Sequence, residues 1–150
     1  MTQTINISYE HYTLDTLPTA DSELVKAAFE ATTQAYAPFS GFKVGAAARL
    51  RSGEIITAAN CESEVFPSGL CAERSLLCHY ASNYASSPIE AMAIASNPSE
   101  RECYPCGACR QVILDAENRQ QSPIRIVMAG GGTATIVGSA KDLLPFMFKL

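Results

Sequence analysis

Basic residues are scarce in this sequence. Eleven Lys and Arg residues stand against fifteen Asp and Glu residues, which gives a formal net charge of −4. Proteins that hold polynucleotides usually carry a basic stripe that displaces counterions from the phosphates, and no such stripe is present here. The charge balance therefore argues against a polynucleotide partner and favours a small, roughly neutral molecule.

Long apolar runs are also missing. No stretch approaches the length of a membrane span, and residues 1–10 are polar, without the apolar core of a signal peptide. We expect no membrane association and a cytoplasmic location. The 150 residues contain no repeat, low-complexity tract or linker, so they predict one domain over 21–150, preceded by an N-terminal arm over 1–20.

Hydrophobic periodicity predicts alternating helices and strands. Residues 21–36 have the spacing of an amphipathic helix, and Pro38 and Gly41 end it. The expected elements that follow are strands at 42–50 and 55–59, a helix at 70–84, a strand at 89–96, a helix at 106–117, strands at 124–129 and 134–137, and a helical turn at 141–144. This order predicts an α/β fold in which helices cover both faces of a mixed sheet.

Cysteine is the residue type that carries the chemistry. Six cysteines occur, and three of them fall within residues 103–109. In a cytosolic chain with an ordinary core, clustered cysteines favour metal binding over disulfides. The strongest motif is Cys71-Ala72-Glu73 combined with Pro105-Cys106-Gly107-Ala108-Cys109.

Three thiolates, from Cys71, Cys106 and Cys109, would leave one tetrahedral position of a zinc ion open, as catalytic zinc sites do. Water in that position is acidified towards a neutral pKa. Glu73 is the expected catalytic carboxylate, close to the metal without being a ligand, and the arrangement matches the signature of zinc-dependent deaminases. Arg74, one helical turn from Cys71, is expected to contact the cysteine sulfurs from outside the ligand set.

Other interpretations of these cysteines remain. Cys106 and Cys109 alone would equally fit a redox pair or a structural zinc site. Cys103 forms a competing Cys-x-x-Cys pair with Cys106, but it precedes the expected helix and is interpreted as a bystander. Four residues are expected in packing or at the surface, namely Cys61, Cys78, His11 and His79. The glycines at 130–132 lack the following Lys-Ser/Thr of a phosphate loop and predict a turn.

Over about residues 22–148, the chain resembles the homotetrameric cytidine deaminases. The segments that carry the resemblance are 36–47 (YAPFSGFKVGAA), 60–62 (NCE), 71–74 (CAER), 105–111 (PCGACRQ) and 142–145 (DLLP). The resemblance implies a three-layer α/β/α sandwich with a mixed five-stranded sheet. It also implies one Zn²⁺ per chain, assembly as a homotetramer, and hydrolytic deamination of cytidine and deoxycytidine in pyrimidine salvage.

The resemblance further assigns substrate contacts. Phe42 would pack on the pyrimidine, Asn60 and Glu62 would bind the ribose 3′-hydroxyl, and the Ala72 N–H would bind the 2-oxo group. The Tyr104 carbonyl would accept from the amino group. Phe148 would enter the site of a neighbouring subunit.

Several positions depart from the family pattern. Ser63 and Glu64 stand where Asn-Ala is common, and Tyr104 stands where a small residue is common. These departures concern substrate specificity more than the reaction. The alternatives are a related deaminase acting on another amino-nucleoside, nucleotide or base, a non-catalytic zinc module, and a thiol redox protein.

Overall fold

The computed structural model describes residues 1–150, and its centre is a single mixed sheet in the order β1-β6-β5-β4-β2-β3. The strands are β1 (Tyr9–Thr13), β2 (Lys43–Leu50), β3 (Ile55–Ala59), β4 (Ile89–Asn97), β5 (Arg125–Gly130) and β6 (Thr133–Val137). Only the central pair β4 and β5 is parallel. All other neighbours are antiparallel.

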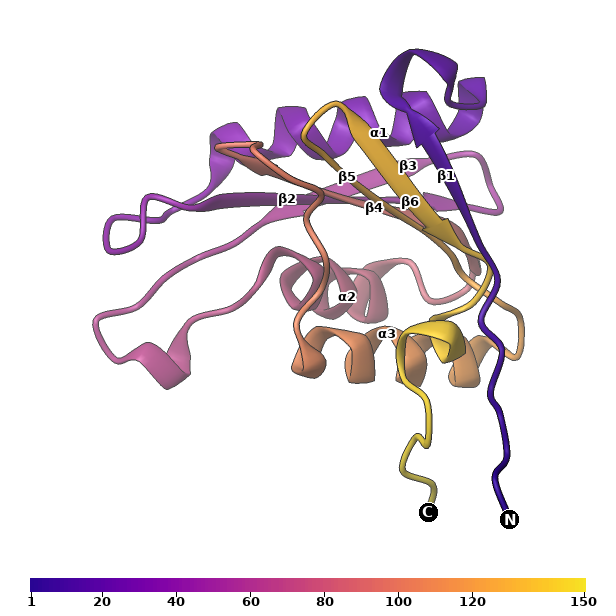
Figure 1. The fold of residues 1–150 in the computed structure, drawn as a ribbon. Coiled ribbons are helices and arrows are strands. Elements are labelled where there is room, and N and C mark those ends of the chain that lie inside the picture. Colours follow the sequence, from indigo (N-terminus) through magenta and orange to yellow (C-terminus); the bar gives the residue numbers. More distant parts are fainter.

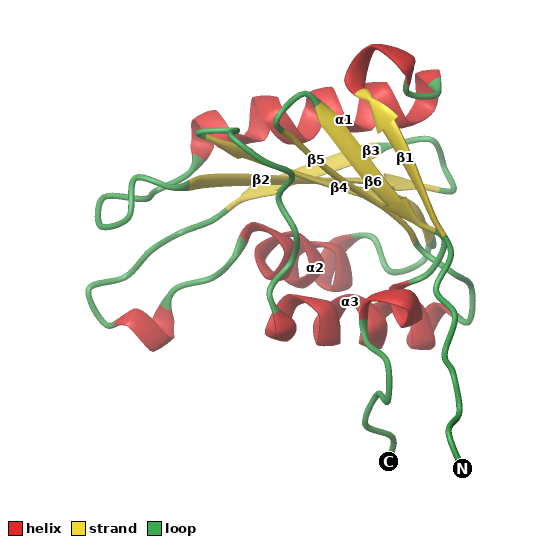
Figure 2. Ribbon diagram, viewed as in Figure 1, coloured by secondary structure: helices red, strands yellow, loops and turns green.

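Helices cover both faces of this sheet (Figures 1 and 2). Helix α1 (Thr19–Ala31) lies on one face, and α2 (Ala72–Asn83) and α3 (Gly107–Gln120) lie together on the other. Short 3₁₀ turns complete the chain at Leu14–Thr16, Thr32–Gln34, Phe66–Ser68 and Ala140–Leu143. The expected three-layer α/β/α sandwich is confirmed. None of its helices combines the length and apolar character needed to span a membrane.

Strand β4 has buried apolar side chains on both faces of the sheet, so both faces need a covering layer of helix. Its side chains alternate between two cores, because successive residues of a strand point to opposite faces. Met92 and Ile94 enter the core beneath α2 and α3, whereas Ala91, Ala93 and Ala95 face α1. The small side chains on the second face let α1 lie close to the sheet.

Gly45 shows how close that approach is. A Cβ added at Gly45 would lie 2.0 Å from the Ala28 carbonyl oxygen, so only glycine fits where α1 crosses β2. This contact holds α1 against β2, the strand that begins directly after Phe42.

The sheet has six strands, and not the five that were expected. The additional strand β1 comes from the N-terminal arm and pairs antiparallel with β6, from Tyr9 opposite Val137 to Thr13 opposite Thr133. Four of its five residues are exposed, so the segment carries no buried apolar alternation that would predict a strand. Its place in the sheet depends on backbone pairing with β6.

The three glycines at 130–132 form the turn between β5 and β6, and all have positive φ. Gly130 also allows a close approach, because a Cβ there would lie 2.1 Å from the Arg101 carbonyl oxygen. The segment after β4 therefore lies directly on this turn. That contact brings residues 101–105 to the edge of the site.

Candidate active site

The three predicted ligand cysteines meet at the N-termini of α2 and α3. Cys71 and Cys106 are the N-cap residues of the two helices, and Cys109 lies in the first turn of α3. The three Sγ atoms all lie within 4.8 Å of one another, and Cys106 and Cys109 are 3.5 Å apart. Because unpaired N–H groups and the positive dipole end stabilise anions, both helix starts favour thiolates.

The donor set fits a zinc ion. Three sulfur ligands at one point are the soft donors that zinc accepts, and three protein ligands leave one position for a reactant. Burial raises the pKa of the Cys106 thiol, but hydrogen bonds from the Cys109 and Ala108 N–H groups outweigh it and leave that pKa below its ordinary value. Cys103 is not part of the cluster, and burial raises its pKa to about 11.

Arg74 lies beside the cluster. Its Nη2 donates to the Cys71 Sγ at 3.5 Å, and this contact raises the pKa of the guanidinium. Its Nε is buried without a hydrogen-bond partner. Burying an N–H donor without an acceptor costs free energy. An anionic cluster of metal and thiolates beside Arg74 would offset that cost.

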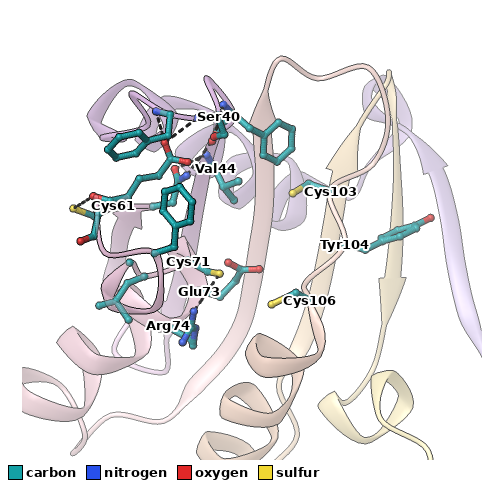
Figure 3. Close-up of a pocket in the computed structure, with 17 residues that line it drawn as sticks. Ser40, Val44, Cys61, Cys71, Glu73, Arg74, Cys103, Tyr104 and Cys106 are labelled. Atoms are coloured by element: carbon teal, nitrogen blue, oxygen red, sulfur yellow. Dashed lines mark hydrogen bonds between the residues drawn. The ribbon is translucent and has the colours of Figure 1, made fainter.

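Glu73 is the second residue of α2 and is only 4% exposed. Burial raises the pKa of its carboxyl group above the ordinary value, since the charged form loses hydration. Its side chain lies between Cys71 and Cys106 at the base of the cavity (Figure 3). The sequence therefore brings a buried carboxylate next to the three thiols without making it one of them.

A cavity of about 490 Å³ opens above these groups, a volume typical of small-molecule sites. Its base carries Cys71, Cys106, Glu73 and Arg74. The other walls include residues predicted to contact substrate, namely Phe42, Asn60, Glu62 and Tyr104. Ala72, another predicted substrate contact, is fully buried at the start of α2 and is not among the residues that line the cavity.

Asn60 and Glu62 each hold a loop in addition to lining the cavity. The Asn60 Oδ1 accepts from the Val44 N–H at 2.8 Å, and its Nδ2 donates to the Phe42 carbonyl at 2.9 Å. One Glu62 oxygen accepts from the N–H groups of Phe39 and Ser40 at 2.9 and 3.1 Å. Hydrogen bonds from Ser40 and Phe39 lower the pKa of Glu62, so its carboxylate stays charged.

Phe148 lies apart from this cavity. It is 76% exposed in the C-terminal tail and lines a different groove, with Gln111 and Met147. The structure therefore does not bring Phe148 to the site of its own chain.

Sequence reasoning missed parts of the site wall. Cys103, interpreted as a bystander, lines the cavity, and so do Phe39 and Phe66, whose rings meet edge to face at 5.8 Å. Phe39 falls in the 36–47 segment that carries the family resemblance, so its place in the site wall could have been predicted from the sequence. Cys103 had no signal of its own, since its position depends on the contact between residues 101–103 and the 130–132 turn.

Comparison with known proteins agrees with this site. Residues 18–122 match the family model for the cytidine and deoxycytidylate deaminase zinc-binding region. The cytidine deaminase of Mycobacterium tuberculosis is 33% identical over 138 residues, covering 89% of this chain and 94% of that protein. The cytidine deaminase of Halalkalibacterium halodurans is 38% identical over 92 residues, covering 61% of this chain and 68% of that protein.

Solved structures show the same fold. The crystal structure of cytidine deaminase from Burkholderia pseudomallei has a TM-score of 0.72 and 34% identity, covering 84% of this chain and 97% of that chain. The Mycobacterium tuberculosis enzyme has a TM-score of 0.72 and 30% identity, covering 89% and 100%. Fold and site thus define a hydrolytic deaminase with a zinc-binding region. The chain belongs to the cytidine and deoxycytidylate deaminase family.

Proposed function

We propose that this enzyme hydrolyses the 4-amino group of cytidine and deoxycytidine, releasing ammonia and giving uridine and deoxyuridine. It would act in the cytoplasm, in pyrimidine salvage, with one zinc ion per chain. The observation that carries the proposal is the meeting of three cysteine sulfurs within 4.8 Å, beside buried Glu73, at the base of a nucleoside-sized cavity.

The metal would be held by Cys71, Cys106 and Cys109. When bound, zinc supplies Lewis acidity that makes water a nucleophile near neutral pH. Glu73 takes a proton from the attacking water and delivers it to N3 of the ring as the new C–O bond forms at C4. Glu73 then takes the proton of the new 4-hydroxyl group and passes it to the amino group, so that the C4–N bond breaks as the C4=O bond forms and ammonia is released.

The remaining residues bind and orient the substrate. The Phe42 ring packs on the pyrimidine, and the Ala72 N–H donates to the 2-oxo group. The Tyr104 carbonyl accepts from the amino group that will leave. Asn60 and Glu62 bind the ribose 3′-hydroxyl. Arg74 withdraws charge from the Cys71 sulfur, which limits how far three thiolates weaken the Lewis acid.

Charges in the cavity favour a nucleoside over a nucleotide. Among the charged residues that line it, Glu62 and Glu73 are acidic, and Arg74 is engaged with Cys71. A phosphate group on the ribose would lie nearer to Glu62 than to any free cation lining this cavity. Cytidine monophosphate should therefore be a poor substrate.

The test is an ultraviolet assay of cytidine, deoxycytidine, free cytosine and cytidine monophosphate. Both nucleosides should turn over. Free cytosine should lose about 30- to 1,000-fold in kcat/KM, the order expected when polar groups that the bound nucleoside would cover lose a partner worth roughly 2–4 kcal/mol. Truncating the substrate is cleaner than replacing Asn60 or Glu62, because both side chains also hold loop backbone. Equal activity on free cytosine would contradict the proposal.

A further inference from the structure

Glu102 is a nearly buried carboxylate, and it organises side chains just outside the cavity. Its side chain is 8% exposed. Its Oε2 accepts from the Tyr104 hydroxyl at 2.8 Å, and its Oε1 accepts from the Thr133 hydroxyl at 2.6 Å. Burial raises the pKa of Glu102, but hydrogen bonds from Thr133, Thr135 and Tyr104 outweigh it and keep the pKa below its ordinary value.

The N-terminal strand reaches the same carboxylate. The His11 Nδ1 on β1 lies 3.5 Å from the Glu102 Oε1 and 3.2 Å from the Thr135 hydroxyl on β6. The hydrogen-bonded group therefore joins β1, β6 and the segment that precedes α3. It gives the N-terminal arm a physical connection to the site.

The backbone on either side of Tyr104 is fixed. Glu102 forms an antiparallel bridge with Gly130, and the Cys103 N–H donates to the Ala129 carbonyl at 3.1 Å. On the other side, the Arg110 Nε donates to the Pro105 carbonyl at 2.8 Å. Between these points, the hydroxyl of the Tyr104 side chain donates its hydrogen bond to Glu102.

Tyr104 also stands at a boundary. Phe42, Cys103 and Tyr104 line both the cavity above the cysteines and a second, adjoining cavity of about 1130 Å³. The Tyr104 ring points away from Cys103 and Cys106 (Figure 3), so its backbone, and not its hydroxyl, faces the reacting groups. Glu102 lines only the second cavity and does not line the first.

We propose that Glu102 is a positioning residue for deamination: by holding the Tyr104 hydroxyl, it fixes the Tyr104 peptide and ring at the edge of the substrate cavity. The inference rests on the proposed function, in which the Tyr104 carbonyl accepts from the amino group. Glu102 itself contacts neither the substrate nor the cysteines. It acts through Tyr104.

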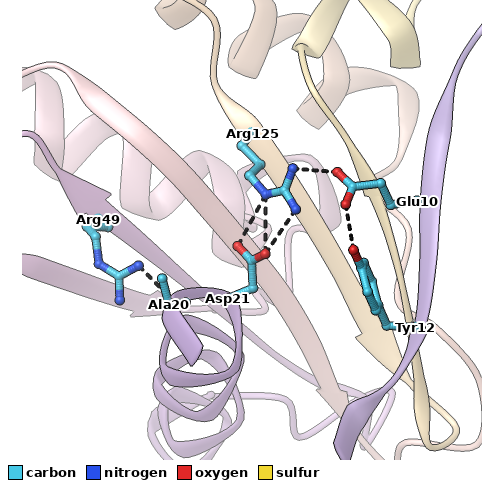
Figure 4. Close-up of polar contacts among 6 residues, drawn as sticks. All are labelled: Glu10, Tyr12, Ala20, Asp21, Arg49 and Arg125. Atoms are coloured by element: carbon cyan, nitrogen blue, oxygen red, sulfur yellow. Dashed lines mark hydrogen bonds and ion pairs between the residues drawn. The ribbon is translucent and has the colours of Figure 1, made fainter. Parts of the chain in front are cut away.

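The chain offers a matched control. The Tyr12 hydroxyl donates to the Glu10 Oε2 at 2.8 Å, also across two residues (Figure 4), and the Tyr12 ring packs against the core on the face of the sheet that α1 covers. Tyr104→Phe and Tyr12→Phe each delete one exposed hydroxyl from a Tyr–Glu pair, and neither threatens the fold. Only the first should change catalysis.

The experiment measures kcat and KM for cytidine in Tyr104→Phe, Glu102→Ala, their double variant and Tyr12→Phe, with zinc content measured for each. We expect both single variants to lose about 2- to 12-fold in kcat/KM, which is the order of one ordinary side-chain hydrogen bond. The double variant should lose no more than Glu102→Ala alone, because Glu102→Ala already removes the contact that Tyr104→Phe removes. Zinc content and the Tyr12→Phe kinetics should match wild type.

A second readout does not rest on the size of the loss alone. Glu102→Gln keeps a side-chain oxygen that can accept from the Tyr104 hydroxyl, so it should retain most of the activity that Glu102→Ala loses. The losses in Tyr104→Phe and Glu102→Ala should fall on kcat more than on KM, because the amino group leaves in the chemical step. No rescue by Glu102→Gln, or Tyr104→Phe kinetics equal to those of Tyr12→Phe, would overturn the positioning role while leaving deamination in place. A wild-type enzyme inactive on every amino-nucleoside would overturn the proposed function and this role together.

Discussion

At the scale of single residues, Glu73 differs from the other carboxylate of the cavity wall. Glu62 is tied to the N–H groups of Phe39 and Ser40, whereas Glu73 is buried beside three sulfurs. Glu73→Gln keeps the shape and removes the ability to carry protons. We expect turnover to fall at least about 10³-fold, since general acid–base catalysis is worth roughly 10²–10⁴ and Glu73 would serve more than one transfer.

Measuring zinc content together with turnover distinguishes a role of Glu73 in proton transfer from a role in metal binding. Glu73→Gln should retain wild-type zinc, because Glu73 is outside the set of three sulfurs. A loss of less than about tenfold, equivalent to ~1.4 kcal/mol in barrier, with zinc retained would exclude Glu73 as the proton carrier. Loss of zinc together with rate would instead mark it as a structural neighbour of the metal.

The cysteines give a second prediction at this scale. Cys71→Ala, Cys106→Ala and Cys109→Ala should each lose zinc, because each removes one of the three sulfurs that meet. Cys103→Ala should keep it, since its thiol lies outside that group. Metal analysis after dialysis under reducing conditions checks this, and zinc loss from Cys103→Ala with retention in Cys106→Ala would reverse the ligand assignment.

At the scale of elements, strand β1 is joined to the rest of the fold by charge as well as by pairing with β6. Arg125 on β5 contacts Glu10 of β1 at 2.7 Å and the buried Asp21 of α1 at 3.0 Å (Figure 4). One guanidinium therefore links three elements. The hydrogen bond from Arg125 lowers the pKa of Glu10 below its ordinary value of 4.5, with Tyr12 adding to the effect.

This lowered pKa predicts how stability depends on pH. A carboxyl whose pKa is lower in the folded state stabilises the fold above its ordinary pKa, and that contribution is lost as the pH falls. The free energy of unfolding of wild type should therefore fall more steeply than that of Glu10→Gln between about pH 5 and pH 3. Urea titrations at several pH values measure this, and equal slopes for the two proteins would contradict it.

At the scale of the whole molecule, Phe148 is the residue whose predicted role requires a partner. It is exposed in the tail and lies outside its own cavity. If it enters a neighbouring site, the active species should elute at about four times the chain mass of 16.1 kDa. Phe148→Ala should raise KM for cytidine, since a wall of that site is removed.

Phe146→Ala is the control for this prediction, because Phe146 is 92% exposed in the same tail. Its kinetics should match wild type. Gel filtration combined with the ultraviolet assay makes both measurements on one sample. A fully active monomer, or unchanged kinetics in Phe148→Ala, would remove the shared site.

Local features of this protein could be predicted from its sequence. Apolar periodicity predicted α1, α2 and α3 and the strands from β2 to β6, because burial of one face imposes a repeat on the residues. The Cys71 and Pro105 motifs predicted where two helices begin, since an N-cap environment is a property of a few consecutive residues. The chemistry followed from the residue types, which need no coordinates to be known.

The tertiary structure alone decided what depends on distant contacts. It placed β1 on β6, Cys103 in the cavity wall, and Glu102 between Tyr104, Thr133 and His11. It also gave Asn60 and Glu62 their hydrogen bonds to loop backbone. Most of these contacts join residues far apart in the chain, through backbone pairing or through hydrogen bonds of individual side chains, and neither leaves a periodic pattern in the sequence.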